Sequence, residues 1–130
     1  MKVLTLREPW ASLIGEKIKL IETRSWSTKY RGELYIHAGS ASIPKNDKRI
    51  NSLRALLKGP LHTGNIFLKC NLIDCIEITE DFANQVKAEN LNNYLCGDYS
   101  VGRFAWILSD VQYVDEIPAK GQLSIWNFTQ

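Results

Sequence analysis

The sequence predicts an α+β fold in which five or six strands form a small β-barrel with short helices around it. Strand-like runs dominate the chain, and the helical segments between them are short and irregularly spaced. This pattern favours a small barrel over a parallel sheet, in which crossover helices alternate regularly with strands. The 130 residues, 45% of them apolar, suffice for one core without disulfide bonds or a metal ion. We therefore expect a single domain over residues 1–130.

The first expected elements are a weak strand, a short helix and a central strand. Residues 2–6 alternate only weakly between apolar and polar side chains. Pro9 can begin a helix, and the apolar residues after it recur at helical spacing, which predicts a helix over residues 9–17. The run ELYIHA, residues 33–38, has the period-two pattern of a strand and places His37 on its polar face. We expect this strand to be central in the sheet.

The rest of the chain predicts two helices and three strands. In residues 44–58, leucine and isoleucine recur every three or four positions opposite basic side chains, which indicates an amphipathic helix. A second helix is expected to begin after Thr79 or Asp81, either of which can cap it. The three strands are the β-rich runs 64–78 and 104–114 and the residues after Gly121. Trp106 and Trp126 lie in apolar strand patterns, so we expect both in the core.

Positive charge is concentrated in the first part of the chain. Residues 1–58 carry twelve Lys and Arg against five Asp and Glu, a net charge of +7, whereas the remainder carries −5. Such asymmetry is typical of a face that binds a polyanion, because basic side chains neutralise phosphates and release counterions. It also arises when charges are scattered over a solvated surface, and charge alone does not separate these two interpretations.

Several classes of protein are not indicated. No run of about 18 apolar residues occurs, and the N-terminus lacks the apolar region of a signal peptide, so we expect a cytoplasmic protein without a membrane partner. Cys70, Cys75 and Cys96 have no zinc-like spacing and are interpreted as buried thiols. The two histidines are far apart, and no glycine-rich phosphate loop is present, so we expect neither a metal nor a cofactor.

The segment KLIETRSWSTKYRGELYIHA, residues 19–38, brings charged residues next to Trp26 just before the central strand. On an extended backbone Glu22 and Arg24 share a face, so a carboxylate and a guanidinium can pair there or jointly bind the edge of a base. Trp26 is either a core residue or a partly exposed ring on which a base could stack. Arg31 either contacts a phosphate or bonds backbone carbonyls. The segment is therefore a binding site or a charged rim of the barrel.

Four blocks of the sequence resemble successive blocks of the activating signal cointegrator 1 homology (ASCH) domain. They are LREPWASLI, IKLIETRSWSTKYRGELYIHA, GNIFLKCNLIDCIEI, and FAWILSDV with KGQLSIWNF. The resemblance covers essentially the whole chain, and E-x-R-S-W-x-T-x-Y-R-G is its most specific motif. It implies a β-barrel of the PUA-like type and binding of RNA or of a modified nucleoside.

The resemblance also implies which residues form the site, by placing residues 19–26 at the mouth of a cleft. The expected nucleic-acid-binding residues are Glu8, Trp10, Lys19, Glu22, Arg24, Trp26 and Arg31, with Lys48, Arg49 and Arg54 on the basic helix. The family pattern often has Gln at the position of Glu8. Here a carboxylate, which only accepts hydrogen bonds, replaces that amide.

An enzymatic alternative remains open. Some small bacterial members of the family are amidohydrolases that remove the acyl group from N4-acetylcytidine with a Lys, a Thr three residues later and a distant Glu; others are described as ribonucleases. Lys19 matches the Lys, but the third residue after it is Glu22, which leaves Thr23 as a weak substitute nucleophile. If the chain is a hydrolase of modified nucleosides or RNA, Lys19 and Glu22 are its expected acid and base, and it works without a metal.

Overall fold

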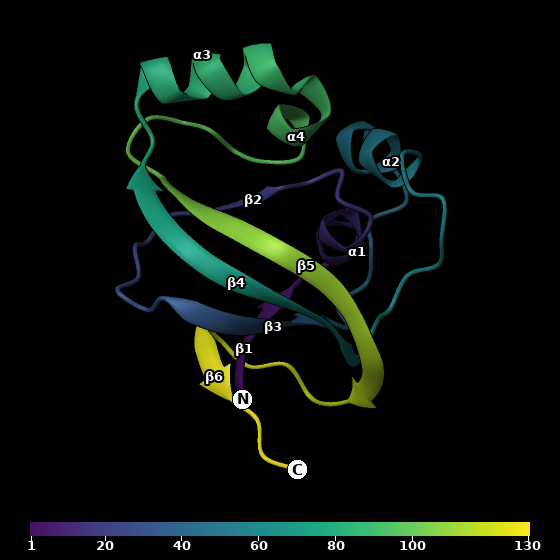
Figure 1. Cartoon of the computed structure of the whole chain (residues 1–130). Helices are drawn as coiled ribbons and strands as arrows, with labels where there is room; N and C mark the ends of the chain where they lie inside the picture. Colours follow the sequence, from purple (N-terminus) through teal and green to yellow (C-terminus); the bar gives the residue numbers. More distant parts are fainter.

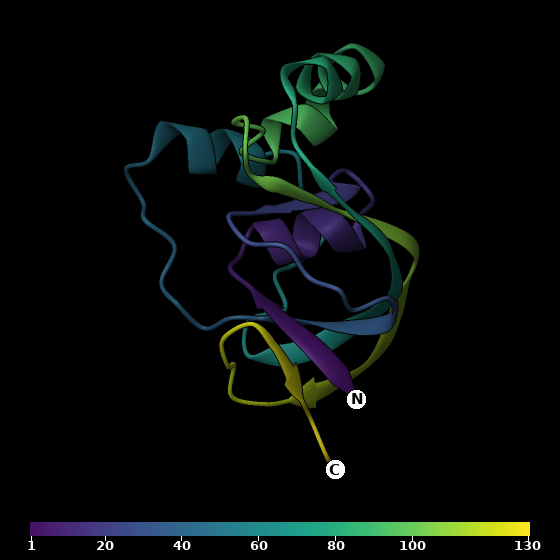
Figure 2. The same cartoon turned by 90° about the vertical axis from the view of Figure 1, so that its left-hand side faces the viewer.

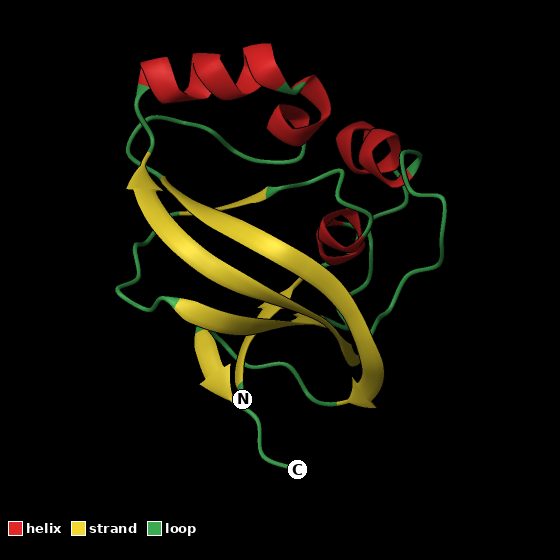
Figure 3. Ribbon diagram, viewed as in Figure 1, coloured by secondary structure: helices red, strands yellow, loops and turns green.

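A computed structural model describes all of residues 1–130 and contains one curled sheet of six strands with four short helices. The strand order is β2-β5-β4-β3-β1-β6, and only the β1/β3 pair is parallel. The strands are β1 (Lys2–Leu6), β2 (Ile21–Arg24), β3 (Gly32–Ala38), β4 (Asn65–Glu77), β5 (Phe104–Pro118) and β6 (Ile125–Asn127). The helices are α1 (Trp10–Gly15), α2 (Lys48–Arg54), α3 (Glu80–Glu89) and α4 (Leu91–Leu95). The sheet forms a half-barrel (Figures 1 and 3), which confirms the predicted α+β barrel of the PUA-like type.

The long antiparallel pair β4 and β5 bends the sheet around its core. Ile66, Leu68, Cys70 and Leu72 alternate along β4 and are all buried, as period-two packing against a core requires. The register between β4 and β5 shifts at three places along the pair. Such bulges increase the local twist and bend a strand pair, so the sheet curls instead of lying flat.

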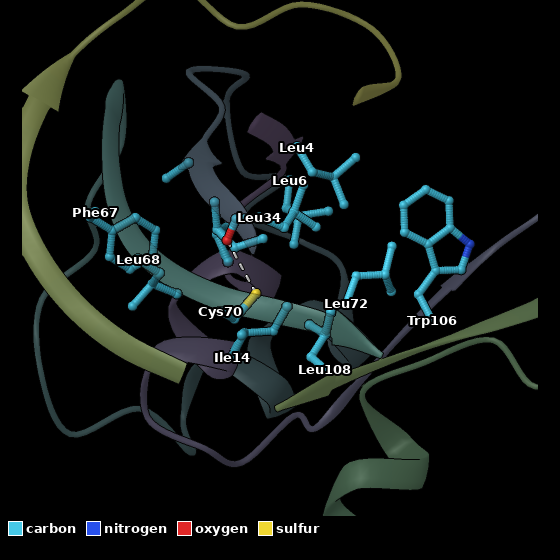
Figure 4. Close-up of a cluster of buried hydrophobic side chains, with 13 residues drawn as sticks. Leu4, Leu6, Ile14, Leu34, Phe67, Leu68, Cys70, Leu72, Trp106 and Leu108 are labelled. Carbon is cyan, nitrogen blue, oxygen red and sulfur yellow. Dashed lines mark hydrogen bonds between the residues drawn. The ribbon is translucent and has the colours of Figure 1, made fainter. Parts of the chain in front are cut away.

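The main core lies inside this curl and consists of 13 buried residues, ten of which are labelled in Figure 4. Trp106 is fully buried there, and Trp126 packs in a smaller cluster beside β1, so both are core residues as predicted. The Cys70 thiol lies 3.4 Å from the carbonyl oxygen of Leu34, and burial raises its pKa to about 12. All three cysteines are free; Cys70 and Cys96 are buried, as predicted, whereas Cys75 is only half-buried.

The helices agree with the sequence in place but are shorter than the periodic patterns suggested. α1 covers six residues of the predicted 9–17, and α2 covers seven of the predicted 44–58. The Asp47 side chain accepts a hydrogen bond from the backbone of Ile50 and so fixes the start of α2. Thr79 caps α3 in the same way, as one of the two predicted caps.

The placement of His37 on a polar face was wrong. His37 is wholly buried, because the β3/β4 register shifts between Ile36 and His37 and the chain before β6 covers this end of the strand. Its Nε2 lies 2.7 Å from the carbonyl oxygen of Ala119, and its Nδ1 lies 3.2 Å from Thr5 Oγ1. Both ring nitrogens of His37 are therefore engaged in hydrogen bonds within the protein, so the imidazole does not serve to bind a ligand.

The helices gather at one end of the sheet, away from the two termini. In Figures 1 and 2, α1 lies within the curl, whereas α2, α3 and α4 lie beyond the edge formed by β2. The end of β1, the start of α1, strand β2 and the loop between α4 and β5 meet in this region. Each of the four helices is too short to cross a membrane.

Candidate functional site

A cavity of about 330 Å³ opens where these segments meet. Its lining comes from the end of β1, the start of α1, the residues around β2, one residue of α2 and the loop between α4 and β5. The lining residues are Thr5, Leu6, Arg7, Trp10, Lys19, Glu22, Thr23, Arg24, Arg49, Cys96, Gly97, Asp98 and Arg103. Ten of these thirteen are not hydrophobic, so the cavity is suited to a polar ligand.

A line of alternating charges, Lys19, Glu22 and Arg24, forms one side of the cavity. The Lys19 ammonium lies 3.3 Å from Glu22 Oε1, and the Arg24 guanidinium lies 2.9 Å from Glu22 Oε2. Lys19 is 1% exposed and also donates to the carbonyl oxygens of Ile21 at 2.7 Å and Cys96 at 3.4 Å. Its three N–H groups thus have acceptors within the protein, as a buried ammonium requires.

Arg24 is held by aromatic rings as well as by Glu22. Its guanidinium lies 5.2 Å from the ring centroid of Trp26 and 5.8 Å from that of Trp106, distances typical of cation–π contacts. The two tryptophans pack edge to face, with centroids 4.8 Å apart. The buried Nε of Arg24 has no hydrogen-bond partner in the protein, although the side chain lines the cavity. Arg24 is therefore fixed in position while its buried Nε remains uncommitted.

Three further arginines stand around the cavity. Arg49, on α2, donates to the carbonyl oxygens of Leu95 and Gly97, each at 3.2 Å, and lies 5.9 Å from the ring centroid of Trp10. Arg103 donates to the carbonyl oxygens of Asp98 at 3.1 Å and Thr23 at 3.3 Å. Arg7, at the end of β1, donates to the carbonyl oxygen of Ser42 at 3.3 Å.

Asp98 is the second carboxylate of the cavity. Hydrogen bonds from the Ser100 hydroxyl and backbone N–H, with weaker contributions from the positive charges of Arg103 and Arg49, hold the pKa of Asp98 below its usual range against the opposing effect of burial. The backbone N–H of Asp98 in turn donates to Thr23 Oγ1 at 3.0 Å, which ties the loop after α4 to β2. The carboxylate is therefore ionised at neutral pH and offsets part of the positive charge around it.

Five of the ten predicted nucleic-acid-binding residues line this cavity: Trp10, Lys19, Glu22, Arg24 and Arg49. Thr23, the weak candidate nucleophile, lines it as well. The expectation that Lys19, Glu22 and Arg24 converge on one cavity agrees with the structure. The aromatic wall is Trp10, because Trp26 is turned toward Trp106 and packs against the core.

Glu8, a predicted cleft residue, lies outside the cavity. Its carboxylate is 2% exposed and accepts hydrogen bonds from the Ser12 backbone N–H at 2.8 Å, the Ser12 hydroxyl at 2.6 Å and the His62 backbone N–H at 2.8 Å. Three donors of the protein occupy it, so it joins the start of α1 to the segment before β4.

The other predicted binding residues also lie outside the cavity. Arg31 donates to the backbone carbonyls of Thr28 and Tyr30, both at 2.9 Å, and its guanidinium lies 3.6 Å from Asp74. This matches the alternative in which Arg31 bonds backbone carbonyls. Lys48 and Arg54 are exposed on α2.

The sequence did not indicate the contribution of Arg7, Asp98 and Arg103. The last two belong to the segment CGDYSVGR, residues 96–103, whose glycines and polar residues mark an ordinary loop. Nothing local shows that this loop folds back onto β2, which lies some 75 residues earlier in the chain. Arg7 precedes the PW pair of a recognised block, and only its place at the end of β1 brings it to the cavity.

No three His, Cys, Asp or Glu side chains lie close enough together to hold a metal ion. The cavity offers guanidinium donors, two carboxylates, the Thr23 hydroxyl and the Trp10 ring. These can bind an anionic ligand with a polar, planar part.

Comparison with known proteins agrees with the resemblance found in the sequence. The family model of the ASCH domain matches residues 4–118, which include the last three residues of β1, all of β2 to β5 and all residues of the cavity. Activating signal cointegrator 1 of Mus musculus and that of Homo sapiens are each 29% identical to this chain over 126 residues, which are 95% of the chain and 21% of the relative. The chain thus spans about a fifth of the length of these relatives. By the match of its fold-forming residues, the chain belongs to the ASCH domain family.

Proposed function

We propose that this chain binds RNA and takes one nucleotide of it into the cavity. The observation that carries the proposal is the charge of the lining, in which one lysine and four arginines stand against two carboxylates, an excess of three positive charges. Such an excess around a small hollow attracts a phosphate-bearing ligand. The binding of RNA expected of ASCH domains points in the same direction.

The volume of the cavity supports a ligand of nucleoside size. Ligand pockets hold about 300–1,000 Å³, and this cavity of about 330 Å³ lies at the lower end of that range. Trp10 supplies a flat aromatic wall for a base.

The polar groups suggest how a base and a phosphate would share the cavity. Glu22 can accept from an exocyclic amino group, and the uncommitted Nε of Arg24 can donate to an acceptor on the same edge. Arg7 and Arg103, which also line the cavity, carry further guanidinium donors that can bind phosphate oxygens. Specificity for the base would then arise from Glu22 and Arg24, and affinity for the phosphate from Arg7 and Arg103.

Binding is tested by fluorescence anisotropy with labelled single-stranded and structured RNA at low salt, on the order of 50 mM. Arg24→Gln and Arg103→Gln should each weaken binding about tenfold or more, because a hydrogen bond to a charged group contributes roughly 1.5–3 kcal/mol. Lys2→Gln, which removes the same charge from an exposed position at the start of β1, serves as the matched control and should leave the affinity unchanged.

Salt dependence separates phosphate contacts from other interactions. For single-stranded RNA, the slope of log affinity against log salt should fall by about 0.7 when one phosphate-binding arginine is replaced. Thermal denaturation of each variant checks that it is folded. If no RNA binds at low salt, or if the cavity variants bind as tightly as Lys2→Gln, the proposal is wrong.

A hydrolase acting on a modified nucleoside is the second candidate, because Lys19, Glu22 and Thr23 line the same cavity. The Thr23 hydroxyl accepts a hydrogen bond from the backbone N–H of Asp98, and its own proton is still free to be donated. Lys19 is less suited to act as a base, since its N–H groups are engaged by Ile21, Cys96 and Glu22.

The test is incubation with N4-acylated cytidines and other modified nucleosides, followed by chromatography of the products. Turnover that is lost in Thr23→Val would favour this candidate. Turnover that persists in Lys19→Met and Thr23→Val would exclude the mechanism. If the unmodified protein turns over none of the substrates, binding without catalysis is favoured.

A further inference from the structure

The cavity continues into a second, larger hollow beyond Arg49. This outer hollow has a volume of about 520 Å³ and is lined by seven residues: Arg49, Tyr94, Leu95, Gly97, Asp98, Tyr99 and Ser100. Three of them, Arg49, Gly97 and Asp98, also line the first cavity. The two hollows are therefore neighbours that share a boundary, and together they exceed the volume that one nucleoside fills.

Arg49 forms that boundary and still has donors to offer. Both of its hydrogen bonds, to the carbonyl oxygens of Leu95 and Gly97, come from a single nitrogen of the guanidinium. The other nitrogens make no hydrogen bond within the protein, and the residue is exposed. A guanidinium anchored by one nitrogen and free at the others is well placed to bind an anion that passes between the two hollows.

Tyr99, one of the residues that line the outer hollow, has a buried hydroxyl without a partner. Tyr99 is 6% exposed, and its hydroxyl makes no hydrogen bond in the protein. Its ring stacks on that of Tyr94, with centroids 5.2 Å apart. Burial above all, and then the nearby Cys96, Glu22 and Tyr94, raise the pKa of Tyr99, so the phenol keeps its proton and remains a donor. Buried donors are rarely left unsatisfied, which suggests that a ligand acceptor completes this one.

We propose that the ligand is an RNA strand of at least two nucleotides, with one in the cavity, its neighbour in the outer hollow, and Arg49 bound to the phosphodiester between them. This inference rests on the proposed function, and adds to it that a free nucleoside occupies only half of the site. The hydroxyl of Tyr99 donates a hydrogen bond to the nucleotide in the outer hollow. Arg49 would bind the phosphodiester that links the two nucleotides, whereas Glu22 and Arg24 would bind only the base in the cavity.

The experiment compares short ligands that differ by one part. Calorimetric titrations of the whole chain use each of the four common ribonucleosides, their 3′- and 5′-monophosphates and the matching dinucleotides. The dinucleotide is expected to bind about tenfold or more tightly than the nucleoside, because a charge-assisted hydrogen bond adds roughly 1.5–3 kcal/mol. It should also bind more tightly than either monophosphate, since only the dinucleotide fills the outer hollow.

Variants and a modified ligand assign this gain to its source. Arg49→Gln should lower the affinity for the dinucleotide about tenfold and that for the nucleoside much less, because a nucleoside has no phosphate for the guanidinium to bind. A dinucleotide whose linking phosphate is replaced by a neutral methylphosphonate should bind the unmodified protein as weakly as the normal dinucleotide binds Arg49→Gln. The Arg49→Gln substitution should cause no further loss of affinity for this methylphosphonate ligand. This arm of the test needs no change in the protein, so it is unaffected by any loss of stability.

Tyr99→Phe tests the outer hollow separately. It removes an unpaired buried hydroxyl but keeps the ring, so the fold should be as stable or more stable while the dinucleotide binds more weakly. The inference is overturned if the dinucleotide binds no tighter than the better monophosphate, if Arg49→Gln weakens nucleoside and dinucleotide equally, or if Tyr99→Phe has no effect on dinucleotide binding. In these cases nucleotide binding in the cavity still stands. If none of these probes and no longer RNA binds, the proposed function fails as well.

Discussion

The ammonium of Lys19 lies 3.3 Å from the carboxylate of Glu22, at a position where the lysine is 1% exposed. Two buried charges are costly to remove from water, and they remain buried only when each has close partners. Here Glu22 is shared between Lys19 and Arg24, and Lys19 also donates to the carbonyl oxygen of Cys96. The pair therefore joins β2 to the loop after α4, and the shape of the cavity depends on it.

The first prediction concerns the removal of Lys19. Lys19→Ala should destabilise the protein by about 3–5 kcal/mol, because it leaves Glu22 without one partner and the carbonyl oxygens of Ile21 and Cys96 without a donor. Urea denaturation near neutral pH measures the loss. Lys19→Met combined with Glu22→Gln should recover part of it, since the buried carboxylate charge is removed while the amide oxygen can still accept from Arg24. A Lys19→Ala variant as stable as the unmodified protein would show that the pair does not support the fold.

The sequence allowed the fold to be predicted further than the site. The alternating apolar residues of β3 and of the first half of β4 are buried against the core, so their pattern carries the strand signal directly, although His37 and Phe67 are buried as well. β2 and α4 escaped prediction because they are only four and five residues long. Their conformations depend on tertiary partners, which for β2 is the strand β5.

The same distinction explains the site. Lys19, Glu22 and Arg24 are close in the chain, so a common cavity could be expected from sequence. The loop that carries Asp98 and Arg103 reaches the cavity only through long-range contacts to Thr23, which no local pattern shows. The structural role of Glu8 could have been predicted from the local sequence. Ser12 follows Glu8 by four residues, and the backbone N–H of Ser12, at the start of the helix, donates to the Glu8 carboxylate.

The second prediction is that Glu8 stabilises the fold without taking part in binding. Glu8→Ala should cost about 2–3 kcal/mol in the free energy of unfolding, because it leaves the buried N–H groups of Ser12 and His62 without acceptors. The affinity of the folded fraction for RNA should not change. Glu16→Ala is the matched control: Glu16 also accepts two backbone hydrogen bonds, from Lys58 and Gly59, but at an exposed place where water replaces them. A strong loss of affinity at unchanged stability in Glu8→Ala would contradict this assignment.

The third prediction concerns pH and the Asp98 carboxylate. Because hydrogen bonds from Ser100 are the main cause of its lowered pKa, Ser100→Ala should raise the pKa of Asp98 toward its usual value. A carboxyl whose pKa is lower in the folded state contributes stability above its unfolded pKa and loses that contribution as the pH falls through the folded pKa. The stability difference between the unmodified protein and Ser100→Ala should therefore be present at neutral pH and vanish in acid. NMR titration of the Asp98 carboxyl and denaturation at several pH values measure both effects; an unshifted Asp98 titration would refute the assigned cause.

The fourth prediction concerns Gly97, which lies where the cavity and the outer hollow meet. A methyl group added at this position would lie 2.7 Å from the Tyr99 ring and 3.1 Å from the side chain of Thr23. The loop after α4 must then move away from β2, so Gly97→Ala should destabilise the protein by about 1–3 kcal/mol and weaken RNA binding.

Gly59→Ala provides the control for this substitution, because a methyl group there meets only the Glu16 carboxylate, at an ordinary distance of 3.5 Å. Its stability and RNA affinity should match those of the unmodified protein. The loop also carries the carbonyl oxygen that anchors Arg49, so displacement of Gly97 should reduce dinucleotide affinity more than nucleoside affinity. If Gly97→Ala instead leaves stability and both affinities unchanged, the loop is free to move away from Thr23 and Tyr99, and neither hollow depends on its close packing.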